Sequence, residues 1–236
     1  MREGRSDDQL RPIRLTHGVN RWAEGSALVE WGDTRVQATV TVEDKLPPHL
    51  RGGKHRGGWL TAEYALLPRA TGTRRPRERL HASGRTVEIQ RLIGRALRTA
   101  VDLNAVPKRT MTVDVDVLQA DGGTRCAGIV AGHAALREWA DRQIRAGTLS
   151  EWPLRCDVTA VSVGLLDGRP LTDLDYREDD AAELDLNVVA SADGRLIEVQ
   201  GGSEGEPIDA ETYVTLVARG VRGAQAVMRA VESSLP

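Results

Sequence analysis

Apolar and polar residues alternate along two early segments, residues 27–31 and 36–42, which residues 32–35 separate. A period of two is typical of a strand with one buried face, and Gly-Asp between two such runs favours a tight turn. The pattern therefore predicts a β-hairpin here. Residues 59–67 are predicted as a further strand.

Three other segments follow the helical period. From Arg85 onward, apolar residues recur on one helix face, at positions 89, 92, 93, 96, 97 and 100. Residues 124–144 form a second predicted helix, whose first half is apolar nearly all round and is therefore expected to be buried. The last helix is expected to start near Asp209, a residue type that caps helix N-termini well.

The remaining periodic segments are predicted as strands, namely residues 111–118, 157–165 and 170–175 and a hairpin over 184–200. Strands in hairpins that alternate with a few long helices are typical of an α+β fold. No Pro/Ser-rich linker divides the chain, so we expect one compact domain over residues 1–236. The aperiodic stretch 67–84 is long for a connection in such a domain, and we expect it to be functional or mobile.

The composition excludes several classes of protein. Apolar residues make up 40% of the 236 residues, which is enough for a sizeable core and excludes wholesale disorder. No stretch approaches the roughly 18 consecutive apolar residues of a membrane span, and the charged N-terminal residues show no secretory signal. The two cysteines, Cys126 and Cys156, form neither a disulfide framework nor a metal motif. We therefore expect a reduced, cytoplasmic protein with no membrane partner.

The charges are segregated along the chain, although the net charge is only −2. Residues 51–109 hold 14 Lys and Arg against four acidic residues, whereas residues 170–212 hold 13 acidic residues against two Arg. The basic region suits a polyanionic partner. The acidic region suits a hard cation such as Mg²⁺, whose usual ligands are carboxylates. Two solvated surfaces that pair with each other would give the same pattern.

Two predicted helices begin with a cation where the helix dipole disfavours one, in Ser-Gly-Arg-Thr at 83–86 and Gly-Thr-Arg-Cys at 123–126. A cation in the first turn costs about 0.3–1 kcal/mol. A bound anion removes this cost, because the free backbone N–H groups of a helix start already favour negative charge. The pattern predicts a phosphate site with Arg85 and Arg125 as clamps. A single such start would more simply hold an arginine in solvent, but two of them beside the basic region favour the phosphate site.

Paired carboxylates in the acidic region are candidate metal ligands. Asp185 opens the alternating strand Asp-Leu-Asn-Val-Val, and Asp179 is predicted on the turn before it. Such a pair can converge at a bend and hold Mg²⁺ together with a substrate phosphate. A solvated acidic turn is the alternative for this stretch. The glycine patterns of P-loop and Rossmann nucleotide sites are absent from the sequence.

Several longer motifs extend from one end of the chain to the other. They are RSDDQLRPI, AEGSALVEWGDTRV, GWLTAEYALLPRAT, SGRTVEIQRLIGRALR, DVDVLQADGGTR, DLDYREDDAAELDLNVV and IEVQGGSEGEP. Together they resemble the RNase PH family of bacterial phosphorolytic exoribonucleases, the tRNA nucleotidyltransferases.

The resemblance implies roles for individual residues. The family's phosphate-binding residues correspond to Arg85, Gly123, Thr124 and Arg125. Its two catalytic, magnesium-linked aspartates correspond to Asp179 and Asp185. Its RNA-binding loop arginines correspond to Arg69, Arg74, Arg75 and Arg77.

The resemblance also implies the reaction and the partners. We expect phosphorolysis of RNA 3′ ends, especially those of tRNA precursors, with inorganic phosphate as co-substrate and Mg²⁺ as the metal. The products would be nucleoside diphosphates, and the reaction would run in reverse as nucleotide addition. We further expect a homo-hexamer, a trimer of dimers, built from one compact α+β domain per chain.

Two other functions compete with this hypothesis. A hydrolytic nuclease could use Asp179 and Asp185 with water as the nucleophile, but it would leave the two helix-start arginines without a role. A non-catalytic RNA-binding ring subunit would not need the complete set of site residues that this chain retains.

Overall fold

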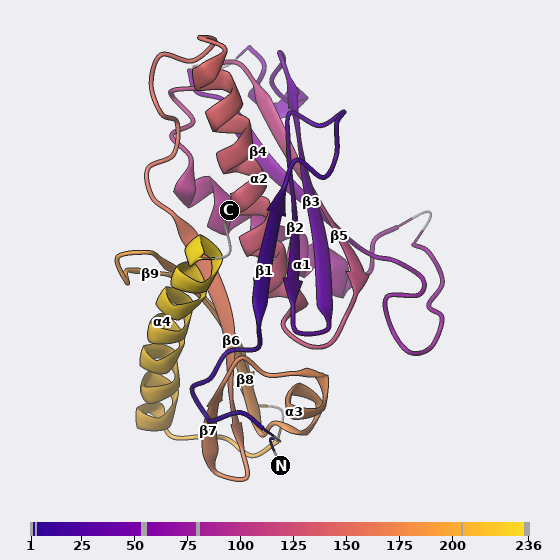
Figure 1. The fold of residues 1–236 in the computed structure, drawn as a ribbon, viewed down its shortest axis with the longest axis vertical. Coiled ribbons are helices and arrows are strands. Elements are labelled where there is room, and N and C mark those ends of the chain that lie inside the picture. Colours follow the sequence, from indigo (N-terminus) through magenta and orange to yellow (C-terminus); the bar gives the residue numbers. More distant parts are fainter. Residues whose placement is uncertain (1, 3, 53–55, 79–80, 204, 234–236) are drawn as a thin grey trace.

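Two β-sheets and four α-helices make up the described part of the computed structural model, which comprises residues 2, 4–52, 56–78, 81–203 and 205–233. Figure 1 shows the first sheet in its upper part and the second sheet below. The arrangement confirms the predicted α+β fold class.

The first sheet has five strands. Their order across the sheet is β1 (Ile13–His17), β2 (Gly25–Trp31), β3 (Thr34–Glu43), β5 (Thr110–Gln119) and β4 (Trp59–Leu66). Neighbouring strands are antiparallel except β4 and β5, whose parallel pairing requires the crossover through α1 (Gly84–Ala100). The β2–β3 hairpin confirms the first predicted hairpin, and its turn is tighter than predicted because Trp31 pairs with Thr34.

The second sheet has four antiparallel strands. Their order is β7 (Arg169–Thr172), β6 (Val158–Leu166), β8 (Leu184–Ser191) and β9 (Leu196–Ser203). The β8–β9 pair confirms the hairpin predicted over residues 184–200. Since β9 pairs only with β8 in this sheet, it forms an edge.

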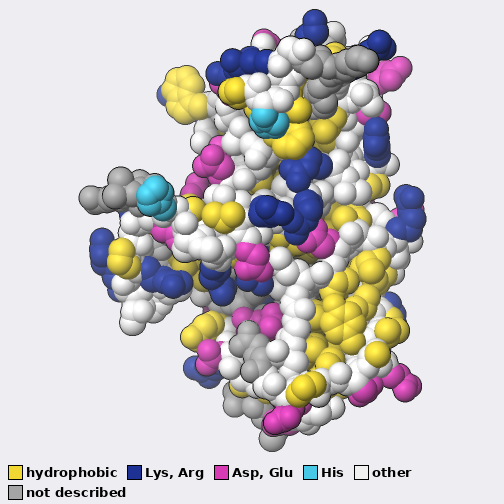
Figure 2. All heavy atoms as spheres, turned by 180° about the vertical axis from the view of Figure 1, so that it is seen from behind, with side chains coloured by type: hydrophobic (Ala, Val, Ile, Leu, Met, Phe, Trp, Pro, Cys, Tyr) yellow, Lys and Arg dark blue, Asp and Glu magenta, His cyan; other side chains and the backbone are white. Residues whose placement is uncertain are grey.

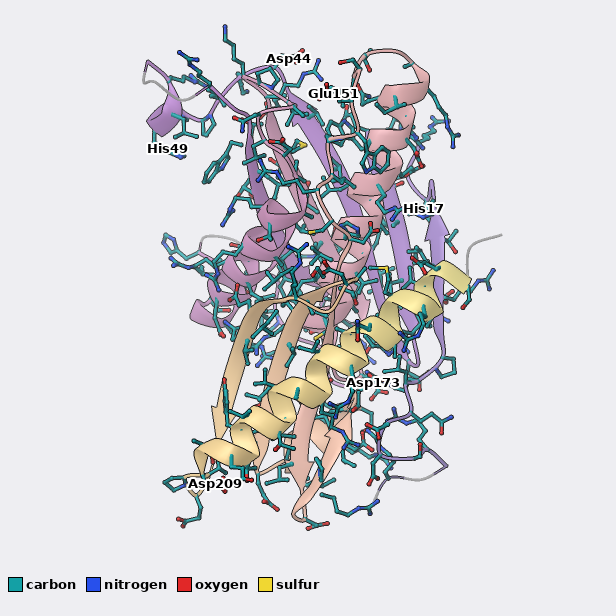
Figure 3. The ribbon with its side chains drawn as sticks, turned by 90° about the vertical axis from the view of Figure 1, so that its left-hand side faces the viewer. His17, Asp44, His49, Glu151, Asp173 and Asp209 are labelled. Atoms are coloured by element: carbon teal, nitrogen blue, oxygen red, sulfur yellow. The ribbon has the colours of Figure 1, made fainter. Side chains whose placement is uncertain are left out.

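The helices connect the two sheets. The helix α2 (Thr124–Arg145) packs on β2 and β3 of the first sheet and on β6 of the second, which explains its apolar first half. The helix α4 (Ala210–Ser233) crosses β6 and β8 diagonally (Figure 3). The amide of Thr212 donates to the Asp209 carboxylate at 2.8 Å, which confirms the predicted N-cap.

The hydrophobic pattern does not predict two short elements, β1 and α3 (Tyr176–Ala181). Five residues with one buried side chain, Leu15, are too few to establish a period in β1. The sequence predicted Asp179 on a turn, whereas it lies within α3. This helix depends on a capping box instead of periodicity, with Asp175 and Glu178 bonded reciprocally at its start.

A single cluster of buried apolar side chains includes residues of both sheets and of α1, α2 and α4. The core therefore continues from one sheet to the other through α2, and this fixes the ends of both sheets near the start of that helix. Within the described residues, no helix combines the length and the apolar character that a membrane span requires.

Candidate active site

A pocket of about 980 Å³ opens where the starts of α1 and α2 meet the β8–β9 hairpin and the loop of residues 67–83. Eight predicted site residues line it, namely Arg75, Arg77, Arg85, Gly123, Thr124, Arg125, Asp179 and Asp185. Basic side chains gather at the centre of the face shown in Figure 2 and on the lobe at its left, with acidic side chains between them. Folding thus brings the basic and the acidic regions of the sequence to one site.

The start of α2 is open to an anion. Gly123 caps the helix in the left-handed conformation (φ 65°), and among the described residues no side chain caps the helix with a hydrogen bond. The Thr124 hydroxyl accepts a hydrogen bond from the Tyr64 hydroxyl at 3.1 Å, which leaves its own proton free to be donated. The first turn contains no acidic residue, as the sequence indicated.

Arg125 lines this pocket and has a buried donor. Only 17% of its side chain is exposed, and its Nη2 lies 3.5 Å from Oε2 of Glu88 on α1. Its Nε atom is buried and has no hydrogen-bond partner in the described part of the chain. A buried donor without a partner costs about 1–3 kcal/mol. An anionic oxygen in the pocket would remove that cost.

The start of α1 is organised differently. Ser83 caps the helix and accepts from the Thr86 amide at 3.2 Å. The Glu78 carboxylate accepts from the Ser83 amide at 3.2 Å and from the Thr86 hydroxyl at 3.1 Å. Hydrogen bonding to Ser83, its side chain first, and to Thr86 lowers the pKa of Glu78. The loop thus places its own anion at this helix start. Arg85 is exposed and lines the pocket beside it.

Tyr64, at the base of the site, reports the local electrostatics. Burial raises the pKa of its hydroxyl, while the bond to Thr124 and the charges of nearby arginines oppose that rise. The arginines concerned are Arg85, Arg125 and Arg75. Three guanidinium groups from three different segments therefore act on one point, which is the field that a phosphate requires.

The two predicted aspartates reach the pocket from different elements. Asp179 lies on α3, and Asp185 lies on β8, where it pairs with Gly202 of β9. Gly201 permits this close pairing, since it has φ 135° and a Cβ there would lie 2.0 Å from the Asp185 carbonyl oxygen.

The side-chain oxygen atoms around these aspartates are suitable ligands for a hard cation. Asp180, Asn187 and Gln200 also line the pocket, and Oε1 of Gln200 is buried with no hydrogen-bond partner among the described residues. The described chain holds no group of three or more His, Cys, Asp or Glu side chains arranged for a metal. Mg²⁺ does not need one, because one or two carboxylates plus substrate phosphate complete its usual shell.

The loop arginines fall into two pairs. All four are exposed, but only Arg75 and Arg77 line the pocket, and Arg69 and Arg74 do not. The backbone of Arg75 donates to the Pro68 carbonyl at 2.8 Å, which folds the loop back on itself. This bond gives the two pairs different positions within one stretch of sequence.

The sequence analysis missed several pocket residues, namely Tyr64, Asp116 and Gln200. Asp116 occupies a polar position of β5, and burial raises its pKa while Arg77 opposes the rise. The strand period predicts only that such residues alternate with buried ones. A polar side chain on the side of a strand that faces a pocket has no distinct pattern in sequence.

Comparisons with known proteins give one consistent result. Residues 9–139 match the model of the 3′ exoribonuclease family, domain 1, and residues 157–223 match domain 2 of the same family. The chain is 51% identical over 235 residues to Ribonuclease PH of Deinococcus radiodurans, an alignment that covers 100% of this chain and 95% of that protein.

Several solved structures share this fold. The Archaeoglobus fulgidus exosome with RNA bound to its active site aligns with a TM-score of 0.81 and 25% identity, over 96% of this chain and 91% of that chain. Rice (Oryza sativa) Rrp46 aligns with a TM-score of 0.78 and 22% identity, over 99% of both chains. The family matches span both sheets and all the predicted site residues. The chain belongs to the RNase PH family of 3′ exoribonucleases.

Proposed function

We propose that this chain trims the 3′ ends of tRNA precursors. We also propose that its pocket carboxylates hold Mg²⁺ and that the chain assembles as a hexameric ring. It is a phosphorolytic 3′–5′ exoribonuclease with inorganic phosphate as co-substrate, as its family membership and its relative's full-length similarity indicate. The RNA class, the metal and the stoichiometry are the parts that we propose.

The phosphate occupies the start of α2. It accepts from Nε of Arg125, from the Thr124 hydroxyl and from the backbone N–H groups that lack a side-chain cap. Arg85 approaches it from α1. These groups hold one phosphate oxygen toward the phosphorus of the last phosphodiester. Because both reactants are anions, positioning and neutralisation of charge account for most of the catalysis.

The aspartates act on the other side of the scissile bond. As the phosphate oxygen bonds to phosphorus, the bond from phosphorus to the 3′ oxygen of the preceding nucleotide breaks. That 3′ oxygen takes a proton from one of the two aspartates, Asp179 or Asp185, which acts as general acid. Asp179 and Asp185 would hold Mg²⁺, which when bound would neutralise charge on the scissile phosphate. The product is a nucleoside diphosphate, and reversal adds a nucleotide.

RNA upstream of the 3′ end follows α1. Arg91, Arg95 and Arg98 lie on this helix at helical spacing, and Arg91 is exposed. Arg95 and Arg98 are partly buried, where Arg95 pairs with Glu198 of β9 and Arg98 donates to the Leu60 carbonyl at 3.0 Å. The Arg98 guanidinium lies 5.2 Å from the centroid of the Trp59 ring, and His49 meets that ring edge-on at 5.6 Å. A cationic stripe that ends at an aromatic pair suits a single strand, since phosphates meet the arginines and a base can stack. The loop arginines Arg75 and Arg77 hold the strand at the pocket itself.

A second copy of the chain covers an apolar surface of α4 and β9. We name this the α4–β9 surface, and its partly exposed side chains are Leu196, Ile197, Val199, Tyr213, Val214, Val217 and Val221. Figure 2 shows hydrophobic side chains gathered at its lower right, on the part of the molecule that contains these two elements. An edge strand beside exposed apolar groups is a typical site for self-association. It supports assembly, and the trimer of dimers remains our proposal.

The buried, unpaired Nε of Arg125 carries the phosphate assignment. The test incubates the protein and Mg²⁺ with a tRNA precursor that is labelled at its 3′ end, once with and once without inorganic phosphate. We expect labelled diphosphates only when phosphate is present. Release of monophosphates in phosphate-free buffer would favour a hydrolytic nuclease instead, and an unchanged rate for Asp185→Asn would remove the aspartates from the mechanism.

A further inference from the structure

The phosphate-binding loop, residues 120–123, follows β5 of the first sheet, whereas Asp185 lies on β8 of the second sheet and Asp179 lies on α3, which contacts β6 of that sheet. The spacing between the loop and these aspartates therefore depends on the junction between the sheets. A buried ion pair occupies that junction. Nη2 of Arg11 lies 2.6 Å from Oδ1 of Asp173, and only 7% and 1% of the two side chains are exposed. Asp173 directly follows β7 of the second sheet, and Arg11 precedes β1 of the first. Figure 3, in which Asp173 is labelled, shows it beside the N-terminal segment.

The Asp173 carboxylate collects donors from the first-sheet side. The backbone N–H of Arg11 donates to it at 2.6 Å and the Trp31 indole N–H at 3.0 Å, in addition to the guanidinium. Asp173 also has φ 58°, a left-handed conformation that costs free energy in a residue other than glycine. A buried ion pair is weak support for stability, since apolar replacements are often neutral. Stability alone therefore does not explain the buried ion pair and the left-handed backbone of Asp173, which indicates another role.

Arg11 continues from Asp173 to the phosphate-binding loop. Its Nη1 donates to the Asp121 carbonyl, and its Nη2 would lie 3.2 Å from a Cβ placed on Gly123, the cap of α2. The guanidinium thus lies next to Gly123, the residue that immediately precedes Thr124 and Arg125. One planar group bonds Asp173 on one side and the loop on the other, a geometry that an ammonium cannot reproduce.

The loop also touches the segment that leads into α3. A Cβ on Gly122 (φ 72°) would lie 2.6 Å from the Leu174 carbonyl oxygen and from the carbonyl carbon of Asp175. Asp175 caps α3, and the Asp179 amide donates to the Asp175 carbonyl at 2.9 Å. A shift of the loop relative to Asp173 is therefore a shift of the phosphate site relative to Asp179.

From this geometry we infer that Arg11 and Asp173 are positioning residues, which set the distance between the bound phosphate and the catalytic aspartates. The inference rests on the proposed function, because it assigns the loop to phosphate and the aspartates to the reacting bond. Neither residue lines the pocket, so both act through Gly123 and α3.

The test compares Arg11→Lys and Asp173→Asn with the wild-type enzyme. Asparagine tolerates the left-handed conformation, and lysine keeps the positive charge. We expect each variant to lose at least tenfold in kcat/KM for phosphate while the Kd for a tRNA precursor changes less than twofold. A variant that only lost stability would keep its kinetic constants well below its Tm. Should Asp173→Asn fail to fold, Arg11→Lys alone decides the question.

Asp7→Asn is the matched control. Asp7 pairs with Arg169 at 2.6 Å between the same two parts of the chain, but 36% and 55% of the two side chains are exposed. We expect wild-type kinetics from it. Wild-type kinetics in both Arg11→Lys and Asp173→Asn would overturn the inference. If the wild-type enzyme released no diphosphates, the proposed function would fail instead. Binding titrations of the three variants with inorganic phosphate would then still test the position of the phosphate-binding loop.

Discussion

At the scale of single residues, Arg125 combines two unfavourable features that a phosphate would offset together. It places a cation at the positive end of the α2 dipole, and its buried Nε has no partner among the described residues. Glu88 contacts only the other end of the guanidinium, at 3.5 Å. Both features support the phosphate site that we propose at this residue.

The variant Arg125→Lys tests this arrangement. Lysine keeps the charge but lacks the Nε donor and the fixed, planar set of N–H groups of arginine. We expect a loss of about 100-fold in kcat/KM for phosphate, equivalent to about 3 kcal/mol. Initial rates of diphosphate release at varied phosphate concentration measure it. Arg145→Lys, an exposed change in the last turn of the same helix, is the control and should behave as wild type.

Asp157 gives a residue-scale prediction about stability and pH. It accepts from Arg137 at 2.5 Å and lies 3.0 Å from His133 Nε2, and these partners, His133 first, hold the pKa of Asp157 at about 2. A carboxyl whose pKa is lower in the folded state stabilises the fold above about pH 4, and this contribution disappears as the pH falls toward 2.

The variant Asp157→Asn should accordingly lose less stability between pH 4 and pH 2 than the wild type does. Because Asp157 is partly exposed, solvent screening reduces the effect to about 1 kcal/mol. Urea unfolding at a series of pH values measures it. Parallel curves for the two proteins across this range would show that the ion pair does not contribute.

At the scale of elements, our proposal divides the binding of RNA between the loop that carries Arg74, Arg75 and Arg77 and the helix α1. The loop carries pocket-facing Arg75 and Arg77 and exposed Arg74 within four residues. The stripe on α1 leads away from the pocket toward Trp59. Contacts near the pocket affect the reacting end of the strand, and contacts along α1 affect the affinity for longer RNA.

The loop arginines offer a matched set of variants. We expect Arg75→Ala and Arg77→Ala each to raise the Kd for a tRNA precursor about five- to tenfold, and to reduce the slope of log Kd against log salt by about one. Arg74→Ala should change the Kd less than twofold. Fluorescence anisotropy at several salt concentrations measures these values, and equal effects from all three variants would contradict the assignment.

At the scale of the whole molecule, the pocket of the proposed active site lies at the junction of two sheets that share α2 and one hydrophobic core. This arrangement supports our proposal that residues 1–236 fold as one unit, although the family is described by two consecutive domain models. The α4–β9 surface bears on assembly, because it exposes apolar side chains that a second copy of the chain can cover.

The variant Val214→Glu tests assembly through that surface. Val214 is 64% exposed, so a charge there should leave the fold of the chain intact and disfavour burial against a second copy. We expect sedimentation velocity to show smaller species than the wild type. Ile144→Glu, a similar change at a helix residue that is 37% exposed, should leave the assembly unchanged. An unaltered wild-type oligomer in Val214→Glu would exclude this surface as the interface.

The sequence by itself determined the local features of this protein. The periods of α1, α2 and α4, the β2–β3 and β8–β9 hairpins and the two Gly-flanked arginines follow from contacts within a few residues, and the motifs indicated the family. Local signals have this reach because capping, turn geometry and amphipathic faces depend on near neighbours in the chain.

Only the tertiary structure decided which of these features meet. It brought Arg125, Arg85 and the two aspartates to one pocket, placed Glu78 at the start of α1 and separated Arg75 and Arg77 from Arg69 and Arg74. It also joined Arg11 to Asp173 across 162 positions of sequence. No periodicity encodes such pairings, since they result from the packing of both sheets on α2 and from the need to pair each buried charge.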